Sequence, residues 1–228
     1  AQKASSVYQT ISQYKNDIPK YHFCLVTFAA RIIEMAKLQI SSEQRSAFPY
    51  AILALHTCMK FPEFKDIFLG TLHTMCPYTI PRYFPKSAQM SNDEYKKLIG
   101  FEQSDDGKFE EPLAYYSRMS GIIMLYAAFV QVDVPNHPHG ISYGWAWLAN
   151  ILNMPPIGIS ATVLIAFLEI AGYSMHLKYK NQFAKLLEYI EREWLPKVPA
   201  KSIAPSAPGN IRLYIAEYKR NRAPAKPD

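Results

Sequence analysis

Cysteine is scarce in this sequence. Its 228 residues include three, Cys24, Cys58 and Cys76, which are far apart and never form a C-x-x-C pair. An odd number of scattered thiols argues against a disulfide framework or a zinc knuckle, and fits a reducing compartment. We therefore expect each cysteine to be a small buried apolar residue.

Glycine is also rare, with nine residues against 17 prolines. This balance favours packed helices separated by proline-containing corners over a turn-rich sandwich. The first residues, AQKASSVYQT, lack the apolar segment of a signal peptide. The sequence does not begin with Met, so we expect a domain excised from a longer protein.

Signatures of catalysis are missing as well. The sequence contains no P-loop, no G-x-G-x-x-G, no G-x-S-x-G and no H-E-x-x-H. His56 and Cys58 are two residues apart, so on a helix they point to different faces and cannot act as a base and a nucleophile. His137-Pro138-His139 has no third ligand nearby and is interpreted as a helix-entry corner, not a metal pair. We expect no enzyme and no metal.

Two apolar segments resemble membrane helices. Ile122–Val132 is shorter than the roughly twenty residues that a span needs. Ile157–Met175 carries Glu169 in its middle, and a carboxylate is costly at the centre of a bilayer. Both are predicted to be core helices, so no membrane span is expected.

Helical periodicity dominates the rest of the chain. Phe183, Leu187, Ile190 and Trp194 follow one helix face, and no stretch alternates for long enough to demand a strand. The predicted class is all-α, a stack of antiparallel helix pairs like HEAT or MIF4G scaffolds, in one domain over 1–222 with a disordered basic tail at 223–228. The expected helices cover 5–16, 20–39, 48–60, 62–75, 91–99, 112–131, 139–153, 159–179, 181–195 and 208–221.

Helix start signals support these boundaries. Ser91 begins a capping box with Glu94. Pro62 and Pro112 stand where a helix could begin, a position that tolerates proline. Ser160 is the expected N-cap of the helix that follows it.

The formal net charge of +6 suggests an acidic partner, which could be nucleic acid, protein or an inositol polyphosphate. Basic and aromatic residues interleave at 78–86 and 214–222. RNA binding by stacking would need exposed rings along a positive groove. The rings in both segments also fit helix or loop packing, so direct RNA binding is not predicted.

From Tyr21 to about Tyr218 the order of short motifs resembles the C-terminal domain of the Gle-one family of RNA export mediators at the nuclear pore. The motifs are weak singly, and their colinear order is what makes the resemblance specific. They include Phe61-Pro62-Glu63-Phe64, Cys76-Pro77-Tyr78-Thr79-Ile80-Pro81, Arg118-Met119-Ser120-Gly121, His137-Pro138-His139-Gly140, Gly144-Trp145-Ala146-Trp147 and Phe167-Leu168-Glu169.

The resemblance implies a non-catalytic activator at the cytoplasmic face of the nuclear pore complex. Members of the family bind the C-terminal RecA-like lobe of the DEAD-box helicase of mRNA export and promote release of RNA and nucleotide. They also bind a C-terminal segment of an FG-repeat nucleoporin. A MIF4G-like translation-initiation scaffold, which would bind another DEAD-box helicase, is the alternative.

In fungal members of the family, inositol hexakisphosphate lies between mediator and helicase. Such a ligand needs several Lys and Arg side chains, yet Thr74 and Met75 stand where many members have two lysines. The basic candidates that remain here are Arg31, Lys37, His73, Arg82 and Lys86.

Aromatic residues are the candidates for nucleoporin binding, because interface anchors are enriched in such rings. The four candidates are Tyr143, Trp145, Trp147 and Trp194. For Trp147 and Trp194 we favour core packing over a surface role.

Overall fold

The structure is a computed structural model that describes residues 2–40 and 43–226. Within these residues it contains no β-strand, only an isolated bridge between Gln103 and Phe109. The all-α prediction is confirmed, while the likeness to HEAT or MIF4G repeats stays a prediction. The α-helices are α1 (Gln2–Gln13), α2 (Ile18–Ile40), α3 (Ala47–Lys60), α4 (Phe64–Met75), α5 (Asn92–Leu98), α6 (Pro112–Gln131), α7 (Ile141–Asn153), α8 (Ser160–Tyr179), α9 (Asn181–Tyr189) and α10 (Ala207–Asn221).

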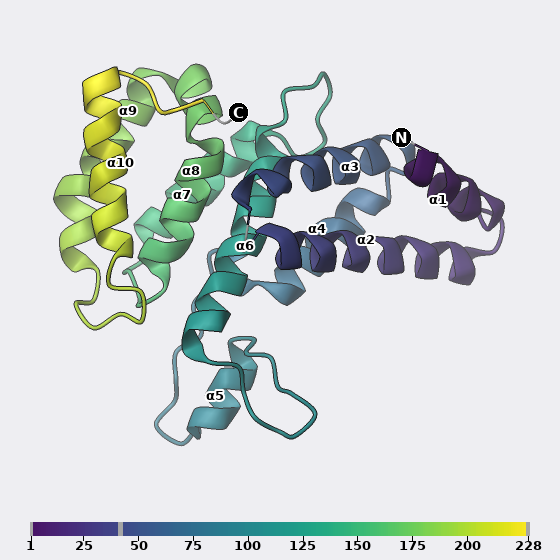
Figure 1. Cartoon of the computed structure of the whole chain (residues 1–228), viewed down its shortest axis with the longest axis horizontal. Helices are drawn as coiled ribbons and strands as arrows, with labels where there is room; N and C mark the ends of the chain where they lie inside the picture. The colour runs from purple at the N-terminus through teal and green to yellow at the C-terminus, as the bar shows by residue number, and fades with distance from the viewer. Residues whose placement is uncertain (1, 41–42, 227–228) are drawn as a thin grey trace.

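Helix α6 lies at the centre of the molecule, with α1–α4 on one side and α7–α10 on the other (Figure 1). All its residues from Ile122 to Val130 are buried, because α2, α3 and α8 pack around it. A helix that is apolar on every side must be enclosed. The core therefore runs along α6 and α8, and both halves of the molecule are built on it.

Both α6 and α8 are long and apolar enough to cross a membrane by length and composition alone. The sequence argument from the shortness of Ile122–Val132 was therefore wrong, since the whole helix has 20 residues. In the fold, 78% and 67% of the most apolar windows of α6 and α8 are buried against other helices. That burial agrees with the predicted core helices.

Two of the predicted helix starts are confirmed. The Ser91 hydroxyl accepts a hydrogen bond from the Glu94 amide, and the Glu94 carboxylate accepts one from the Ser91 amide, which completes the capping box of α5. Pro112 is the first residue of α6. The proline costs nothing there, because the first amides of a helix have no partner within it.

Two other helix starts were predicted wrongly. Helix α4 begins at Phe64, because the amide of Phe64 bonds to the carbonyl of Phe61 and leaves Pro62 in a turn. Ser160 lies inside α8 and does not cap it. Its hydroxyl instead accepts a bond from the Ile157 amide and pairs with the Tyr83 hydroxyl, so it fastens two loops to the helix start.

The helix predicted at 181–195 changes its winding near the end. Regular α9 stops at Tyr189, and a wider π-helical turn covers Ile190–Trp194. Pro196 follows, and a proline ring clashes with the carbonyl four residues before it, so an α-helix cannot continue through it. The wider turn keeps both Ile190 and Trp194 buried.

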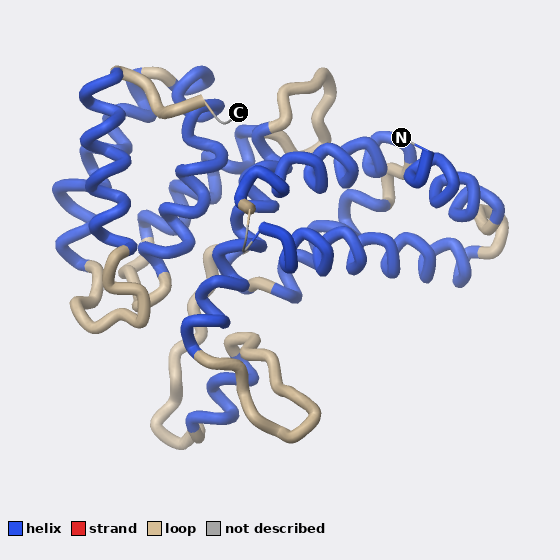
Figure 2. Tube along the Cα trace, in the orientation of Figure 1, coloured by secondary structure: helices blue, strands red, loops and turns tan. Residues whose placement is uncertain are grey.

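A loop excursion at 99–111 stands beside α5 (Figure 2). The Arg118 guanidinium of α6 donates to the Gly100 carbonyl at 2.7 Å and pairs with the Glu110 carboxylate. The Phe101 ring stacks on Tyr115 with centroids 3.9 Å apart. Both ends of the loop are thus attached to α6.

The chain turns back after α10. Arg222 has a left-handed backbone (φ 57°), and Pro224 is buried. The disordered tail proposed at 223–228 stays a prediction, and its last two residues lie outside the described ones.

Candidate functional site

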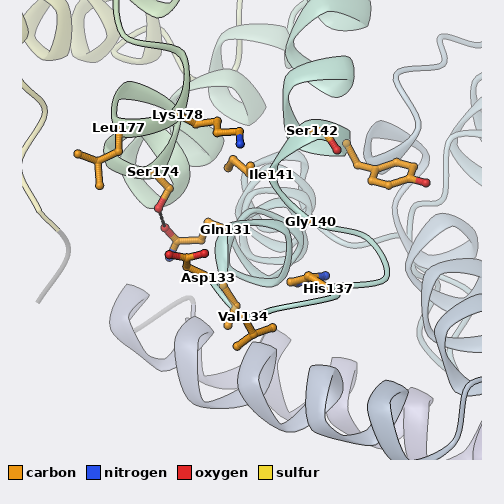
Figure 3. Close-up of a pocket in the computed structure, with 12 residues that line it drawn as sticks. Gln131, Asp133, Val134, His137, Gly140, Ile141, Ser142, Ser174, Leu177 and Lys178 are labelled. Atoms are coloured by element: carbon orange, nitrogen blue, oxygen red, sulfur yellow. Dashed lines mark hydrogen bonds between the residues drawn. The ribbon is translucent and has the colours of Figure 1, made fainter.

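A cavity of about 560 Å³ lies where α6 ends, α7 begins and α8 ends (Figure 3). The Ser174 hydroxyl of α8 donates to the Gln131 side chain of α6 at 2.9 Å and forms part of its wall. Lys178 reaches it from α8, and Asp133 from the loop after α6. One cation and one anion among amide, hydroxyl and apolar groups can hold a peptide, but they do not make an acid–base pair for catalysis.

The His-Pro-His-Gly corner forms one edge of this cavity. His137 Nε2 bonds to the Phe129 carbonyl at 2.8 Å, and its Nδ1 accepts from the His139 amide at 3.0 Å. His137 therefore joins the end of α6 to the start of α7, as the helix-entry interpretation predicts. In the described parts of the chain, no three His, Cys, Asp or Glu side chains are placed to hold a metal ion.

His139 is held between two tyrosines. Its ring stacks on Tyr143 with centroids 3.9 Å apart, and its Nε2 lies 3.3 Å from the Tyr126 hydroxyl. Burial, with smaller contributions from His73, His137 and Lys65, lowers the pKa of His139 to about 4. The ring is therefore neutral at physiological pH.

The four aromatic candidates separate into two pairs. Trp147 is buried, stacks on Phe167 and donates its indole N–H to the Tyr78 carbonyl at 2.8 Å. Trp194 is buried too, as core packing predicts. Tyr143 is 51% exposed at the rim of the cavity, and Trp145 is half-buried. The nucleoporin prediction therefore rests on Tyr143 and Trp145.

The five basic candidates have different local partners. Lys37 of α2 pairs with Glu34 at 2.9 Å and Glu102 at 3.0 Å, so two carboxylates already balance its charge. Arg31 is exposed on the same helix. Arg31 and Lys37 are six positions apart, so on an α-helix their side chains point to different sides.

The other three candidates follow α2 in the sequence. His73 Nδ1 lies 2.8 Å from the Thr79 hydroxyl, and burial lowers the pKa of the ring, which disfavours its cationic form. Arg82 lies over the ring of Phe84. Lys86 donates to the Asn92 side chain at 2.6 Å.

Thr74 and Met75 are the last two residues of α4. The Thr74 hydroxyl bonds back to the Gly70 carbonyl within α4, and Met75 packs on the core. Neither offers a donor to a phosphate, so the end of α4 adds nothing to a polyphosphate site.

An exposed apolar face on α2 was missed by the sequence reasoning. Phe23 is 70% exposed and Leu38 66% exposed, with the exposed Arg31 between them. At 100° per residue these three positions fall within one quarter of the helix circumference, opposite the buried Leu25 and Ala36. A helical wheel could have shown it, because two large apolar residues lie outside the core stripe.

Cys58 and Cys76 are buried as expected, whereas Cys24 is only half-buried. Burial raises the pKa of both the Cys58 and the Cys76 thiol to about 12, so neither forms a thiolate near neutral pH. His56 is exposed while Cys58 is buried, in agreement with the expected separation on α3.

Comparison with known proteins decides the family. Residues 1–191 match the family model described as GLE1-like protein. The chain belongs to this family. The mRNA export factor GLE1 of Mus musculus is 34% identical over 198 residues, and that of Saccharomyces cerevisiae is 26% identical over 230 residues.

These matches cover 84% and 96% of this chain, but 28% and 42% of the mouse and yeast proteins. The chain therefore spans less than half the length of these relatives. The family resemblance inferred from the colinear motifs is confirmed.

Two solved structures share the fold. In one, the C-terminal domain of an S. cerevisiae Dbp5 variant is bound to Gle1 and IP6; its TM-score is 0.86 at 23% identity, over 97% of this chain and 76% of the matched chain. The second, with a Gle1 variant, has a TM-score of 0.85 at 24% identity. The likeness extends beyond residue 191, so α10 belongs to the common fold.

Proposed function

We propose that this chain is a non-catalytic module of an mRNA export factor that binds and activates a DEAD-box RNA helicase at the cytoplasmic face of the nuclear pore complex. The proposed partner surface on the helicase is its C-terminal RecA-like lobe. Activation would consist of faster ATP turnover and faster release of RNA.

The observation that carries this proposal is the fold match to Gle1 bound to a Dbp5 C-terminal domain, over 97% of the chain. The relatives are named as mRNA export factors, which supports a binding role. The buried, protonated thiols also favour it over covalent catalysis. No observation of the fold favours the translation scaffold. The translation helicase therefore serves only as the comparison in the experiment below.

We place the helicase contact on the exposed face of α2. Phe23 and Leu38 together offer an apolar surface on a rigid helix, and a protein partner would remove it from water. Arg31 between them offers a charge that can pair with a carboxylate of the partner. Lys20, Thr27 and Glu34 fall on the same quarter of the helix, so the proposed contact combines two apolar anchors with polar and charged groups.

The proposed ligand is inositol hexakisphosphate, bound with low affinity. The IP6 of the neighbouring structures lies with Gle1 and Dbp5. In this chain Lys37 is neutralised by two carboxylates, and Thr74 and Met75 give no donors. We expect Arg31, Arg82 and Lys86 to give weak binding that falls steeply with salt, because screening weakens exposed charges.

An FG-repeat nucleoporin segment is the proposed second partner. Tyr143 and Trp145 are the aromatic candidates that reach the surface, and Tyr143 lines the cavity of Figure 3. An extended segment could place an apolar side chain in this cavity while its backbone bonds to the amide and hydroxyl groups around it.

RNA-stimulated ATP turnover tests the main proposal. The purified domain is added to the mRNA export helicase, and separately to the translation helicase. We expect stimulation of the export helicase alone. Stimulation of the translation helicase alone would favour the scaffold, and stimulation of neither would refute activation.

The α2 surface is tested with the double variant Phe23→Ser and Leu38→Ser. We expect it to lose most of the stimulation while the fold is retained. Ile203→Ser is the matched control, because Ile203 is an exposed apolar residue remote in sequence from α2. An equal loss in the control would remove the assignment to α2.

Calorimetry with inositol hexakisphosphate at low and moderate salt tests the ligand. We expect a weak signal at low salt that disappears at higher salt. Tight binding that resists salt would show that the basic residues do converge.

A further inference from the structure

A second pocket lies between α8 and α10. Its volume is about 400 Å³, and the chain after α10 closes one side through Pro224 and Ala225. The polar residues of its lining include Glu169 of α8 and Asn210, Tyr214 and Glu217 of α10.

The charge of this pocket is opposite to that of the chain. Its lining includes two carboxylates, Glu169 and Glu217, and no Lys or Arg, in a protein of formal net charge +6. Across the described residues neither carboxylate forms an ion pair, and the polar contact of Glu169 is a long bond of 3.5 Å from the Gln44 amide. Both negative charges are therefore available to a ligand.

The environment of Glu169 strengthens this conclusion. Its side chain reaches solvent, yet the surrounding walls remove enough water to raise the pKa of the carboxyl. A carboxylate that has lost water without gaining a cation is held at a cost. A cation in the pocket would restore the lost interaction.

Tyr214 supplies an independent observation. Its ring lines the pocket, and its hydroxyl is buried with no hydrogen-bond partner among the described residues. The hydroxyl packs against Gly172 of α8, so closely that a methyl group there would lie 1.9 Å from the oxygen. Gly172 is three residues after Glu169, on the same side of α8. An unpaired buried hydroxyl beside a carboxylate is uncommon, and a donor in the pocket would reach it once the Tyr214 side chain turns away from Gly172.

We propose that this pocket binds the guanidinium group of an arginine side chain presented by a basic segment of another protein. A guanidinium has five N–H donors in one plane and no acceptor, whereas the pocket presents acceptors from several directions. Two carboxylates on opposite helices can face the two edges of that plane. A lysine ammonium is a compact point charge and would engage fewer of these groups at once.

The basic residues of the chain's own tail do not fill this pocket. Pro224 and Ala225 form its wall, while Lys226 is exposed and is not part of the lining. Arg220 and Arg222 are exposed as well. The described part of the tail therefore supplies no cation to the lining of the pocket.

This proposal does not depend on helicase activation. The pocket includes α10, which follows the residues matched by the family model, whereas the proposed helicase contact lies on α2. Either proposal could fail while the other holds.

The test is an NMR titration of the ¹⁵N-labelled domain at low ionic strength with N-acetyl-arginine amide, a probe that carries one guanidinium. N-acetyl-citrulline amide is the matched probe, because it has the same shape and no charge. We expect saturable shifts at the amides of Asn210, Leu213 and Glu217 with the arginine probe only. Equal shifts with citrulline, or shifts scattered over the whole surface, would overturn the proposal.

Variants separate the pocket from general surface charge. Glu169→Gln and Glu217→Gln should each weaken arginine binding about fivefold, the effect of losing one partly exposed ion pair. Glu188→Gln on α9 is the control, because Glu188 is an exposed carboxylate outside the pocket. The same loss in the control would mean non-specific attraction.

Tyr214→Phe gives a readout that a purely structural role would not produce. Because its hydroxyl has no partner in the free protein, we expect the variant to fold with unchanged or slightly higher stability. Its affinity for the arginine probe should nevertheless fall. Lower stability with unchanged affinity would exclude the hydroxyl from the site and refute its part in the proposal.

Discussion

Helices α1–α4 and helices α7–α10 lie on either side of the central helix α6, but they leave different chemistry at the surface (Figure 1). The first group exposes large apolar side chains along α2 and α3, while Lys37, which could give that surface a strong charge, is paired with Glu34 and Glu102. The second group encloses two pockets with unpaired charged groups, Lys178 and Asp133 in one and Glu169 and Glu217 in the other.

The difference teaches that the two halves are suited to different kinds of partner. A broad apolar helix face gains free energy when a folded domain covers it. A pocket of a few hundred cubic ångströms with specific polar groups suits one side chain or a short segment. The proposed folded partner and the proposed extended one would therefore use separate surfaces.

The largest effect should come from the aromatic core of the second half. Trp147→Ala removes a buried ring that stacks on Phe167 and bonds to Tyr78. We expect a loss of about 3–5 kcal/mol in the free energy of unfolding, measured by urea denaturation. Trp145→Ala should cost clearly less, because Trp145 is half-buried. Equal losses would contradict the separation of core and surface rings.

Gly172→Ala tests how closely α8 and α10 approach. A methyl group at Gly172 meets the Tyr214 hydroxyl, so we expect a loss of about 1–3 kcal/mol by thermal or chemical unfolding. Gly70→Ala is the matched control in α4, where nothing lies within 4 Å. It should stabilise the fold by about 0.5–1 kcal/mol, since Ala is the better helix former. Relief of the loss by Tyr214→Phe would locate the clash at the hydroxyl.

The junction between the halves should be sensitive to acid. Burial lowers the pKa of His73, His137 and His139, in the last case to about 4. As the pH falls, the unfolded chain binds protons at these histidines before the folded chain does. The free energy of unfolding is therefore at its full value above the histidine pKa of the unfolded chain, about 6.5, and decreases as the pH drops toward 4. Each group contributes at most about 1.4 kcal/mol per pH unit.

Urea midpoints between pH 7 and pH 5 measure this loss of stability. His139→Gln cannot be protonated and should reduce the slope with pH. A midpoint that does not change over this range would contradict the burial of the histidine corner.

The smallest change in stability is expected on α2. Phe23→Ser with Leu38→Ser alters only exposed side chains, so the free energy of unfolding should stay within about 0.5 kcal/mol. The same variant should nevertheless impair helicase stimulation. A large loss of stability would mean that this face is covered by the protein itself.

Much of the fold could be predicted from the sequence, because the long apolar runs of α6 and α8 and the capping box at Ser91 are local signals. The boundary at Pro62 was missed because the amide of Phe64 bonds back to Phe61. The change of winding at Ile190 depends on burying Trp194 before Pro196.

The sites were harder to predict than the helices. The salt bridge between Lys37 and Glu102 joins residues 65 positions apart, so the sequence could not show that this cation is already paired. Glu169 and Tyr214 come from helices that meet only in the folded chain. The exposed positions of Phe23 and Leu38 could be found from the sequence with a helical wheel, because both lie outside the core stripe of α2.

The attachment of the 99–111 excursion to Arg118 has a practical consequence. Because Arg118 bonds to Gly100 at one end of the loop and Glu110 at the other, the chain between them enters and leaves at fixed points. Its tip around Asp105 is exposed and polar. The tip is therefore suited to carry an inserted epitope or fluorophore that would report on the domain.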